Sequence, residues 1–468
     1  MSDLHVVILA AGKGTRMKSA RPKVLHDVAG RPMVDYAMAA ARSLSPRTTT
    51  VVVGHMKELL RQGLERYPGL SFVTQEPQLG TGHALLQTAS VLERETGVVL
   101  LLSGDVPLLK GHTVAALVNK HTESKVAATV LTAIVEQPYG YGRIVRTKGR
   151  ISRIVEERDA SPAQRKIREI NSGVYAFSLG PLFDSLRGLA TGNAQGEYYL
   201  TDLVSTYRRR RLGVETVVVD DPNEIRGINS RSELAEASRI VRQKKNEELM
   251  AAGVTIEDPA TTYVDDDVVV GADTVIHPGV HLEGRTQIGQ ACEIHSGVRI
   301  VNSVLDDRVT VQNFCVITGS RLASGVTVGP FVHIRPETEL RDSVHIGNFV
   351  ELKKAIVGKG TKAGHHAYLG DAVIGDNVNI GAGTITCNYD GSRKHQTTIE
   401  DGVFVGTDSQ LVAPVTIGKG AYVGSGTTIR ENVPPGALAV SAGKQRNIEG
   451  WVEKKRQESR KAKVESGK

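Results

Sequence analysis

An aliphatic residue recurs at every sixth position through the C-terminal half of the chain. The first phase of this repeat contains Val264, Val270, Ile276, Leu282, Ile288, Ile294 and Ile300. After a four-residue step it resumes at Val304 and includes Val316, Leu322, Val328, Ile334, Leu340, Ile346 and Leu352. An α-helix has a period of about 3.6 residues, so it cannot produce this spacing. The repeat therefore predicts short strands joined by turns, three to a coil, in a prism with one buried aliphatic column per corner.

A regular prism has few pockets, so functional residues are expected where the repeat is interrupted or between chains. The first interruption, residues 358–367, takes ten residues in place of six, and the second covers residues 386–398. We expect both to be loops that project from the prism and could close a cleft against a neighbouring one.

The N-terminal half of the chain has a different pattern. Apolar runs at 6–9, 51–53, 71–73 and 98–102 alternate with helical patterns such as 34–43 and 113–120. This alternation predicts an α/β domain with a mostly parallel sheet and helices on both faces. We divide the chain into a domain at 1–230, a linker helix at 231–252, a hexapeptide-repeat domain at 253–450 and a basic tail at 451–468. Ser232 could cap the linker helix, Gly253 could end it, and the tail is predicted to be disordered.

Composition limits the partners that this chain can have. The net charge is +7 and aromatic residues make up 4% of the chain. A basic balance suits nucleic acid or small anionic substrates equally, but the low aromatic content offers no base-stacking platform and so favours small phosphates. No apolar run is long enough to span a bilayer, and the N-terminus has no signal-peptide pattern, so we expect a cytoplasmic protein that does not engage membranes. The three cysteines are far apart and are expected to be reduced.

A glycine-containing loop follows the first strand. Residues 9–17 read L-A-A-G-K-G-T-R-M, and Lys23 follows shortly after. Small residues let backbone N–H groups approach phosphate oxygens, and Lys13 and Arg16 add positive charge. The loop lacks the Walker A ending, and a plain tight turn remains an alternative. Asp105 follows a buried strand, where a carboxylate could hold magnesium beside phosphates or could simply cap a turn.

A second group of polar residues surrounds the interruptions of the repeat. Arg335, Lys353 and Lys394 could form a basic surface for a sugar phosphate. His365 could act as a general base, held in one tautomer by a carboxylate such as Glu351.

Other interpretations of this region remain open. His365 could be an ordinary solvated side chain, or it could bind zinc between subunits with His366, His333 and His345. The segment Asn388-Tyr389-Asp390-Gly391 could be a simple turn.

Motifs along nearly the whole chain, up to about Pro435, resemble known enzymes. L-A-A-G-x-G-T-R-M with P-K-V-L is similar to the opening of sugar-1-phosphate nucleotidylyltransferases. The segments Q-L-G-T-G-H-A, G-D-V-P, Q-G-E-Y-Y-L-T-D, A-G-H-x-x-Y-L-G-D and G-D-N-V-N-I-G-A-G-T-I-T-C-N-Y-D-G resemble the GlmU family. In that family an N-acetylglucosamine-1-phosphate uridylyltransferase is joined to a glucosamine-1-phosphate N-acetyltransferase.

The resemblance implies a fold, an assembly and a function. The fold would be a Rossmann-like nucleotidyltransferase domain followed by a left-handed parallel β-helix, and the assembly a homotrimer with acetyl-transfer sites between chains. The C-terminal half would acetylate glucosamine-1-phosphate with acetyl-CoA. The N-terminal half would then transfer UMP from UTP to N-acetylglucosamine-1-phosphate, supplying cell-wall and outer-envelope glycan synthesis. The alternatives are a monofunctional nucleotidylyltransferase with a structural β-helix, and a scaffold or metal-binding hexapeptide protein with a degenerate N-terminal half.

The resemblance also implies site residues. The UTP and UDP-sugar site would comprise Leu9, Ala10, Ala11, Gly12, Gly14, Lys23, Gln75, Gly80, Thr81, Ser103, Gly104, Asp105, Gly142, Glu156, Asn171 and Asn229. Within it Arg16 and Lys23 would be catalytic, and Asp105 and Asn229 would hold Mg²⁺.

In the C-terminal half, His365 would deprotonate the amine of glucosamine-1-phosphate. That substrate would be bound by Arg335, Lys353, Tyr368, Asn379 and Lys394, and acetyl-CoA by Ala382, Asn388, Tyr389, Thr407, Ser425 and Lys444. Two positions depart from the family pattern. Thr407 stands where serine is common, and Ala442 stands where an arginine near the CoA phosphates is expected, so Lys444 or Arg446 could substitute.

Overall fold

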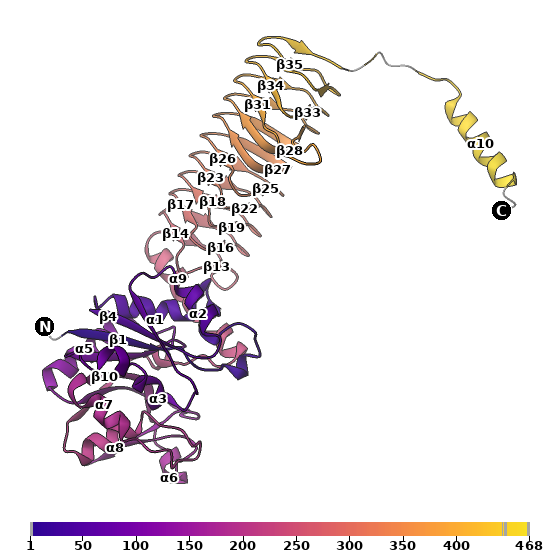
Figure 1. The fold of residues 1–468 in the computed structure, drawn as a ribbon. Helices are drawn as coiled ribbons and strands as arrows, with labels where there is room; N and C mark the ends of the chain where they lie inside the picture. Colours follow the sequence, from indigo (N-terminus) through magenta and orange to yellow (C-terminus); the bar gives the residue numbers. More distant parts are fainter. Residues whose placement is uncertain (1–2, 442, 444–446, 466–468) are drawn as a thin grey trace. The chain divides into compact units, whose positions relative to one another are not determined.

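The computed structural model describes residues 3–441, 443 and 447–465, which divide into two compact units. One unit comprises Met1–Glu248 with Val264–Asp267, and the other comprises Leu249–Tyr263 with Val268–Lys468. The boundary between the units falls near residue 248, inside the helix that the sequence places at 231–252. Figure 1 shows both units, coloured along the sequence from indigo to yellow.

The N-terminal unit is built on one sheet with the strand order β11-β7-β10-β6-β1-β4-β5. These strands are β1 Leu4–Leu9, β4 Thr48–Val53, β5 Leu70–Thr74, β6 Val98–Ser103, β7 Ala128–Ile134, β10 Glu169–Ser178 and β11 Val214–Val218. Only β10 runs antiparallel to its neighbours on this path. A hairpin of β8 (Arg143–Thr147) and β9 (Arg150–Val155) joins the sheet through β10. The predicted mostly parallel sheet is confirmed.

Helices pack on both faces of this sheet, as the sequence predicts. Alternate strand residues point to opposite faces, so Val6 and Ile8 join one apolar cluster while Val7 joins the other. The first cluster includes residues of α1 (Met33–Arg42), α2 (Lys57–Leu64) and α5 (Gly111–Ser124). The second includes residues of α3 (Thr81–Leu86), α7 (Leu179–Arg187) and α8 (Asp202–Arg209).

Helix α9 covers Arg231–Ala251 and matches the predicted helix. Its cap is Ser230 and not the predicted Ser232. The Glu233 N–H donates to Ser230 Oγ at 3.2 Å, and the Glu233 carboxylate accepts from the Ser230 N–H at 2.9 Å. This reciprocal pair satisfies donors at the start of the helix. Ala237 of the helix packs in a small apolar cluster with Val28, which explains why most of α9 belongs to the N-terminal unit.

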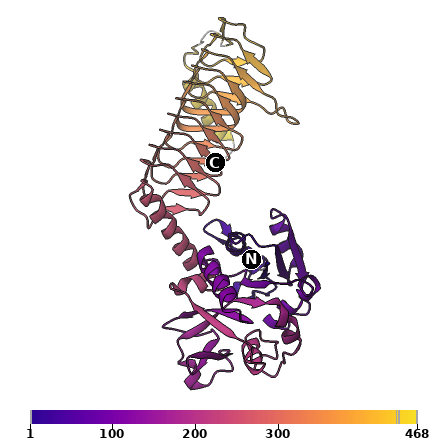
Figure 2. The ribbon, with the colours of Figure 1, turned by 90° about the vertical axis from the view of Figure 1, so that its left-hand side faces the viewer.

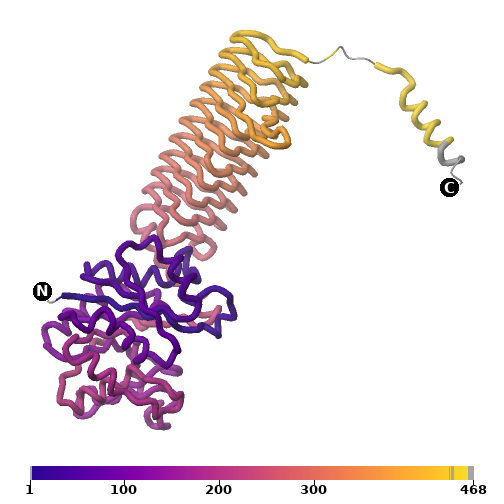
Figure 3. The backbone as a smooth tube through the Cα atoms, viewed as in Figure 1, coloured from indigo at the N-terminus to yellow at the C-terminus, as the bar shows by residue number. Residues whose placement is uncertain are grey.

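The C-terminal unit is a parallel β-helix of short strands from β12 (Thr255–Ile256) to β37 (Leu438–Ala439). Most strands have two or three residues and pair with the strand three further along the chain. Val269 pairs with Gln287 and Val275 with Glu293, so three of the six-residue repeats complete one coil. The stacked coils are visible in the tube drawing (Figure 3). The predicted prism is confirmed.

The buried column follows the predicted phase through Ile300 and then slips by one residue. The structure buries Leu305, Val311 and Ile317, whereas Val304 and Val316 are only partly buried. The coils here are one residue shorter, since Gln287 pairs with Val304, where three full repeats would reach Leu305. A one-residue slip exchanges the inward and outward side chains of a strand. The predicted phase returns at Leu322, which is fully buried.

The two interruptions of the repeat have different structures. The predicted loop at 358–367 is wrong, because β27 (His345–Val357) and β28 (Lys362–Ile374) are long strands paired along most of their length. The second interruption is a loop between β30 (Ile385–Cys387) and β31 (Thr397–Ile399). Ala372 pairs with Thr397, where three full repeats would reach only Asp390, so this coil carries an insertion that projects from the prism (Figure 2).

The tail at 451–468, predicted to be disordered, contains helix α10 at Trp451–Glu465. Glycine and proline are absent from this helix, and Lys, Glu, Arg, Gln and Ala, which favour helix, make up most of it. Among the residues that the structure describes, no helix is long and apolar enough to cross a membrane.

Candidate active sites

The phosphate loop leaves the carboxyl end of β1, the strand between β6 and β4 in the sheet. It leads into a 3₁₀ turn at Thr15–Met17, where Arg16 is exposed to solvent. Gly14 has φ 60°, and a Cβ on it would lie 2.8 Å from Lys23 Cβ. Glycine therefore supplies both the left-handed backbone and the space that lets Lys23 lie against the loop.

Lys23 joins the two predicted metal ligands. Its ammonium forms an ion pair with Asp105 and donates to Asn229 Oδ1 at 3.0 Å. Ser103 Oγ donates to the other Asp105 oxygen at 2.6 Å. The side chains of Lys23 and Asp105 are only 13% and 18% exposed, so the interaction is weakly screened by water. A carboxylate oxygen of Asp105 and the amide oxygen of Asn229 converge on this ammonium. Mg²⁺ prefers such oxygen ligands, so these residues fit the implied ion.

The cap of α9 positions Asn229. Its N–H donates to the Glu233 carboxylate at 2.6 Å, and the neighbouring Ile228 N–H donates to the Asp105 carbonyl at 2.9 Å. The start of one helix and the end of β6 are thereby fixed to each other. The sequence did not indicate Glu233 as part of this site, because its contribution depends on the capping geometry.

A cavity of about 390 Å³ lies beside Lys23 and Asp105. Its lining includes ten of the predicted residues: Leu9, Ala10, Ala11, Gly12, Lys23, Gln75, Gly80, Thr81, Ser103 and Asp105. It also includes Lys13, which the sequence predicts to add charge to the phosphate loop, and four residues outside the predicted set: Val24, Gln78, Ala84 and Glu197. Gln78 Nε2 donates to the Ala11 carbonyl at 3.0 Å and so connects two loops of the pocket. The available signal for Gln78 was its place as the first residue of the quoted Q-L-G-T-G-H-A motif.

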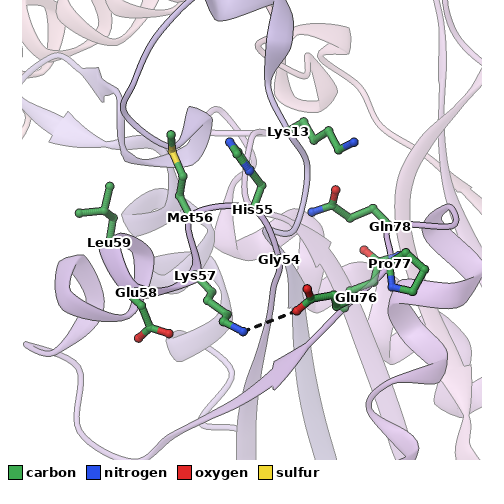
Figure 4. A pocket seen from close by; sticks show the side chains of 11 residues that line it. Lys13, Gly54, His55, Met56, Lys57, Glu58, Leu59, Glu76, Pro77 and Gln78 are labelled. Carbon is green, nitrogen blue, oxygen red and sulfur yellow. Dashed lines mark ion pairs between the residues drawn. The ribbon is translucent and has the colours of Figure 1, made fainter.

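A second cavity of about 580 Å³ adjoins the first and shares Lys13, Gln75 and Gln78 with it. Figure 4 shows its lining, with Lys57 and Glu76 forming an ion pair at 3.6 Å. The sequence did not predict this cavity.

The three predicted sugar residues form a separate cluster: Gly142 directly precedes β8, Glu156 directly follows β9, and Asn171 lies on β10. Asn171 N–H donates to the Gly142 carbonyl at 2.8 Å, and a Cβ on Gly142 would lie 3.5 Å from Glu156 Oε1. Burial raises the pKa of Glu156, although Thr201 donates to its carboxylate at 3.1 Å. The segment before α8 connects the two clusters, because Glu197 lines the nucleotide cavity while Thr201 contacts Glu156.

In the β-helix, the three predicted cations lie close together. Arg335 forms an ion pair with Glu351 at 2.9 Å. Lys394, from the projecting loop, lies against Lys353 on β27, and this neighbouring ammonium lowers the pKa of Lys353, with a smaller contribution from Arg335. Cations this close together repel one another, so the cluster favours a nearby anion.

His365 lies on β28, opposite Asn348 of β27, and is exposed. The predicted contact between Glu351 and His365 does not form within the chain. Glu351 lies opposite Tyr368 and accepts a hydrogen bond from Arg335 instead. The ring of His366 packs instead against Phe349, with centroids 5.2 Å apart.

The predicted acetyl-CoA residues fall into two groups. Asn388 Nδ2 donates to Asp371 at 2.5 Å and lies 3.5 Å from the Tyr368 hydroxyl, while the neighbouring Tyr389 is exposed. Asp371 was outside the predicted site residues, although it ends the quoted A-G-H-x-x-Y-L-G-D motif.

The second group lies at the turns of successive coils. Thr407 Oγ1 donates to Ser425 Oγ at 3.1 Å, and the Ala382 carbonyl accepts from the Asp408 N–H at 2.6 Å. The predicted Asn379 is exposed, lies three residues before Ala382 and pairs with Phe404 of the next coil. Ala442, Lys444 and Arg446 lie outside the described residues.

Comparisons with known proteins divide the chain in the same way. Residues 6–170 match the MobA-like NTP transferase domain, residues 264–346 match the GMPPB C-terminal domain, and residues 396–431 match the bacterial transferase hexapeptide (six repeats).

Relatives named "Bifunctional protein GlmU" match nearly the full chain. That of Pelobacter propionicus is 49% identical over 452 residues, covering 96% of this chain and 98% of the relative. Those of Trichlorobacter lovleyi and Syntrophotalea carbinolica are 50% and 51% identical, covering 97% and 96% of this chain and 99% and 97% of the relatives.

Proposed function

The chain belongs to the GlmU family, and on that premise we propose how its two units divide the chemistry. It is a bifunctional transferase of UDP-N-acetylglucosamine synthesis. The β-helix acetylates glucosamine-1-phosphate with acetyl-CoA, and the N-terminal unit transfers UMP from UTP to N-acetylglucosamine-1-phosphate. The observation that carries this assignment is that the family match covers 96% of the chain and so includes both units.

For uridylyl transfer, we assign UTP to the cavity beside Lys23. Backbone N–H groups of the phosphate loop, together with Arg16 and Lys23, hold the phosphates, while Gln75 and Thr81 hold the uracil. The sugar phosphate oxygen attacks the α-phosphorus of UTP in line, forming a new P–O bond as the bond to pyrophosphate breaks. Positioning and charge neutralisation provide the acceleration, because the reaction requires no covalent nucleophile.

Asp105 and Asn229 would hold Mg²⁺ in this proposal. When bound, the ion neutralises phosphate charge and orients the phosphates. The geometry that supports the assignment is the convergence of both side chains on the Lys23 ammonium. Gly142, Glu156 and Asn171 would bind the sugar, with Thr201 fixing the Glu156 carboxylate.

For acetyl transfer, we assign His365 as the general base. It takes a proton from the amine of glucosamine-1-phosphate as the nitrogen attacks the thioester carbonyl of acetyl-CoA. The C–N bond forms, the C–S bond breaks, and coenzyme A leaves as a thiol after it takes up a proton. Arg335, Lys353 and Lys394 would hold the sugar phosphate, because their clustered charges require an anion.

Tyr368 and Asn379 would contact the same sugar, while Ala382, Asn388, Tyr389, Thr407 and Ser425 would line the acetyl-CoA site. We propose a cytoplasmic location and a homotrimer, in which a neighbouring chain supplies the support that His365 does not receive from Glu351 of its own chain. Sedimentation of the purified protein tests the trimer directly, and a monomer that is fully active in acetyl transfer would contradict it.

The adjacent histidines provide a matched test of the acetyl-transfer site. His365→Ala should lower acetyl transfer, read as free thiol, by about 10²- to 10⁴-fold, the usual contribution of a general base. His366→Ala should retain it, because that ring packs on Phe349. Both variants should keep uridylyl transfer. A wild-type protein that makes UDP-sugar but transfers no acetyl group would leave the β-helix as an assembly domain.

A further inference from the structure

Two histidines and two glutamates gather on one face of the β-helix, outside both transferase sites. Ile256 pairs with Ile276, and Ile276 with Ile294, on successive coils. The residues that follow these buried positions, Glu257, His277 and His295, therefore stack in one outward column. Glu293 precedes Ile294 on β18 (Glu293–Ile294) and points outward on the same face, because strand side chains alternate.

The spacing of the side-chain atoms matches that of metal ligands. Glu293 Oε1 lies 3.4 Å from His277 Nε2 and 3.5 Å from His295 Nε2. Ligands about 2.0–2.2 Å from a tetrahedral ion are roughly 3.4 Å apart, so both spacings already fit. One donor atom from each of the three residues lies within 4.8 Å of the others. The two rings are stacked, with centroids 4.7 Å apart, so a modest ring rotation would bring both nitrogens to one ion.

Glu257 has a different role in the cluster. Its carboxylate lies 3.0 Å from Nδ1 of His277, on the opposite side of that ring from Glu293. A hydrogen bond from Nδ1–H to Glu257 leaves the lone pair of Nε2 directed at Glu293 and His295. Carboxylates orient metal-binding histidines in this way, because they fix the tautomer and strengthen the ligand.

We propose that His277, Glu293 and His295 form a binding site for one divalent transition-metal ion of the Zn²⁺ class, with Glu257 orienting His277. Two imidazoles favour such an ion over Mg²⁺ or Ca²⁺, which take oxygen ligands. The histidine side chains are 22% and 28% exposed, so they are partly desolvated but still accessible to solvent.

The ion would join two successive coils. His277 follows β15 (Val275–Ile276), while Glu293 and His295 flank the corresponding position one coil later. An ion that binds only the folded chain stabilises it by mass action. The site would thus act as a clip near the first coils of the β-helix, separate from the residues assigned to acetyl transfer.

Zinc titration of the full-length protein tests the proposal. Chelator-treated protein is titrated with Zn²⁺ in competition with a chromogenic chelator. Wild type should bind one equivalent more than His277→Asn or His295→Asn. His281→Asn is the matched control, because that ring stacks on Tyr263, 4.7 Å away, and lies outside the cluster. It should bind as wild type does.

A second readout separates ligand loss from misfolding. Glu257→Gln should still bind the additional zinc ion, but with an affinity about 10- to 100-fold lower, as when other carboxylates that orient metal-binding histidines are removed. Zn²⁺ should raise the thermal midpoint of wild type and His281→Asn but not of His295→Asn, and acetyl transfer without zinc should be equal in all variants. Equal zinc binding by wild type and His295→Asn, or wild-type binding weaker than about millimolar, would overturn the proposal and leave a network of histidine–carboxylate hydrogen bonds.

Discussion

Glu156 and Glu157 are adjacent in sequence but have opposite electrostatic surroundings. Burial raises the pKa of Glu156. The pKa of Glu157 is lowered, because hydrogen bonds from Arg143 and from the Gly140 N–H outweigh its desolvation. For a carboxyl with a raised folded-state pKa, folding is penalised as pH rises through that pKa, because the buried group must ionise. For a lowered pKa, stability is present above the unfolded-state value and is lost as pH falls.

These surroundings predict opposite effects of one substitution. At neutral pH, Glu156→Gln should raise the thermal midpoint while it lowers uridylyl transfer, a trade of stability for function. Glu157→Gln should lower stability by about 1–3 kcal/mol, because it weakens the partner of Arg143, which is 1% exposed. Calorimetry measures the thermal midpoints, and an activity assay measures uridylyl transfer. Thermal midpoints that shift in the same direction in both variants would contradict the opposite surroundings of Glu156 and Glu157.

Asp105 should be indispensable to one reaction only. Asp105→Asn removes the charge that faces Lys23, so uridylyl transfer should fall by at least about 100-fold, as when a preorganised electrostatic contact is lost. Acetyl transfer should be unchanged. Asp27→Asn is the matched control, because Asp27 pairs with Arg21 at 3.1 Å on the exposed surface. Comparable losses of uridylyl transfer in both variants would contradict a specific role for Asp105.

Motifs indicated most site residues, but not the contacts between them. Lys23 and Asn229 are 206 positions apart in sequence, and only the fold shows that they share a hydrogen bond. The expected partnership of Glu351 with His365 depended on spacing along the chain. In the structure the next coil places Tyr368 opposite Glu351, and Arg335 takes the carboxylate.

At the scale of elements, the projecting loop should be separable from the prism. The insertion lengthens one coil, as Ile385 pairs with Gln410 where three full repeats would reach Val403. Deleting residues 389–395 would restore the regular spacing seen in the next coil, between Thr397 and Val415. Acetyl transfer should be abolished because Lys394 is lost, whereas circular dichroism and uridylyl transfer should be unchanged. Loss of the β-helix signal would show that the loop is needed for folding.

Helix α5 should carry a pH-dependent contribution to stability. Burial lowers the pKa of His121 to about 4, and its ring lies 3.0 Å from Thr129 Oγ1 of β7. An unfolded histidine titrates near 6.5, so the unfolded state binds more protons between those values. The free energy of unfolding should therefore fall by about 3 kcal/mol as pH drops from about 6.5 to 4.

A matched pair of variants isolates this effect. His121→Gln should remove that pH dependence, whereas His112→Gln, at an exposed position near the start of α5, should retain it. Denaturant unfolding across this pH range measures both. If the free energy of unfolding of His121→Gln depends on pH as steeply as that of wild type, other groups cause the dependence.

Periodicity predicted the elements better than it predicted their boundaries. The six-residue repeat identified the coils, but Val304 and Leu305 are both aliphatic, so only pairing with the neighbouring coil decides which is buried. The long strands β27 and β28 were missed because their coil is one residue short, as His345 pairs with Lys362, so the six-residue phase slips there. Their pairing depends on a close approach, in which a Cβ on Gly347 would lie 1.7 Å from the Gly364 carbonyl oxygen.

At the scale of the whole molecule, two separate cores predict two separable unfolding transitions. Leu100 and Ile300 are both fully buried, one in each unit. Leu100→Ala should lower the midpoint of one calorimetric transition and Ile300→Ala that of the other, each by about 2–5 kcal/mol in stability. A single transition that moves equally in both variants would show that the units unfold together.

The coil length has an evolutionary consequence. Each turn of the prism returns the chain to the corner from which it started, whether the turn is regular, one residue short or enlarged by an insertion. Insertions and deletions in this half should therefore persist only if the chain still returns to the same corner. Such changes add or remove whole turns, or place extra residues at a corner. The loop carrying Lys394 is such a corner insertion. New chemistry can thus be added to an old scaffold without repacking its interior, because the added residues never enter it.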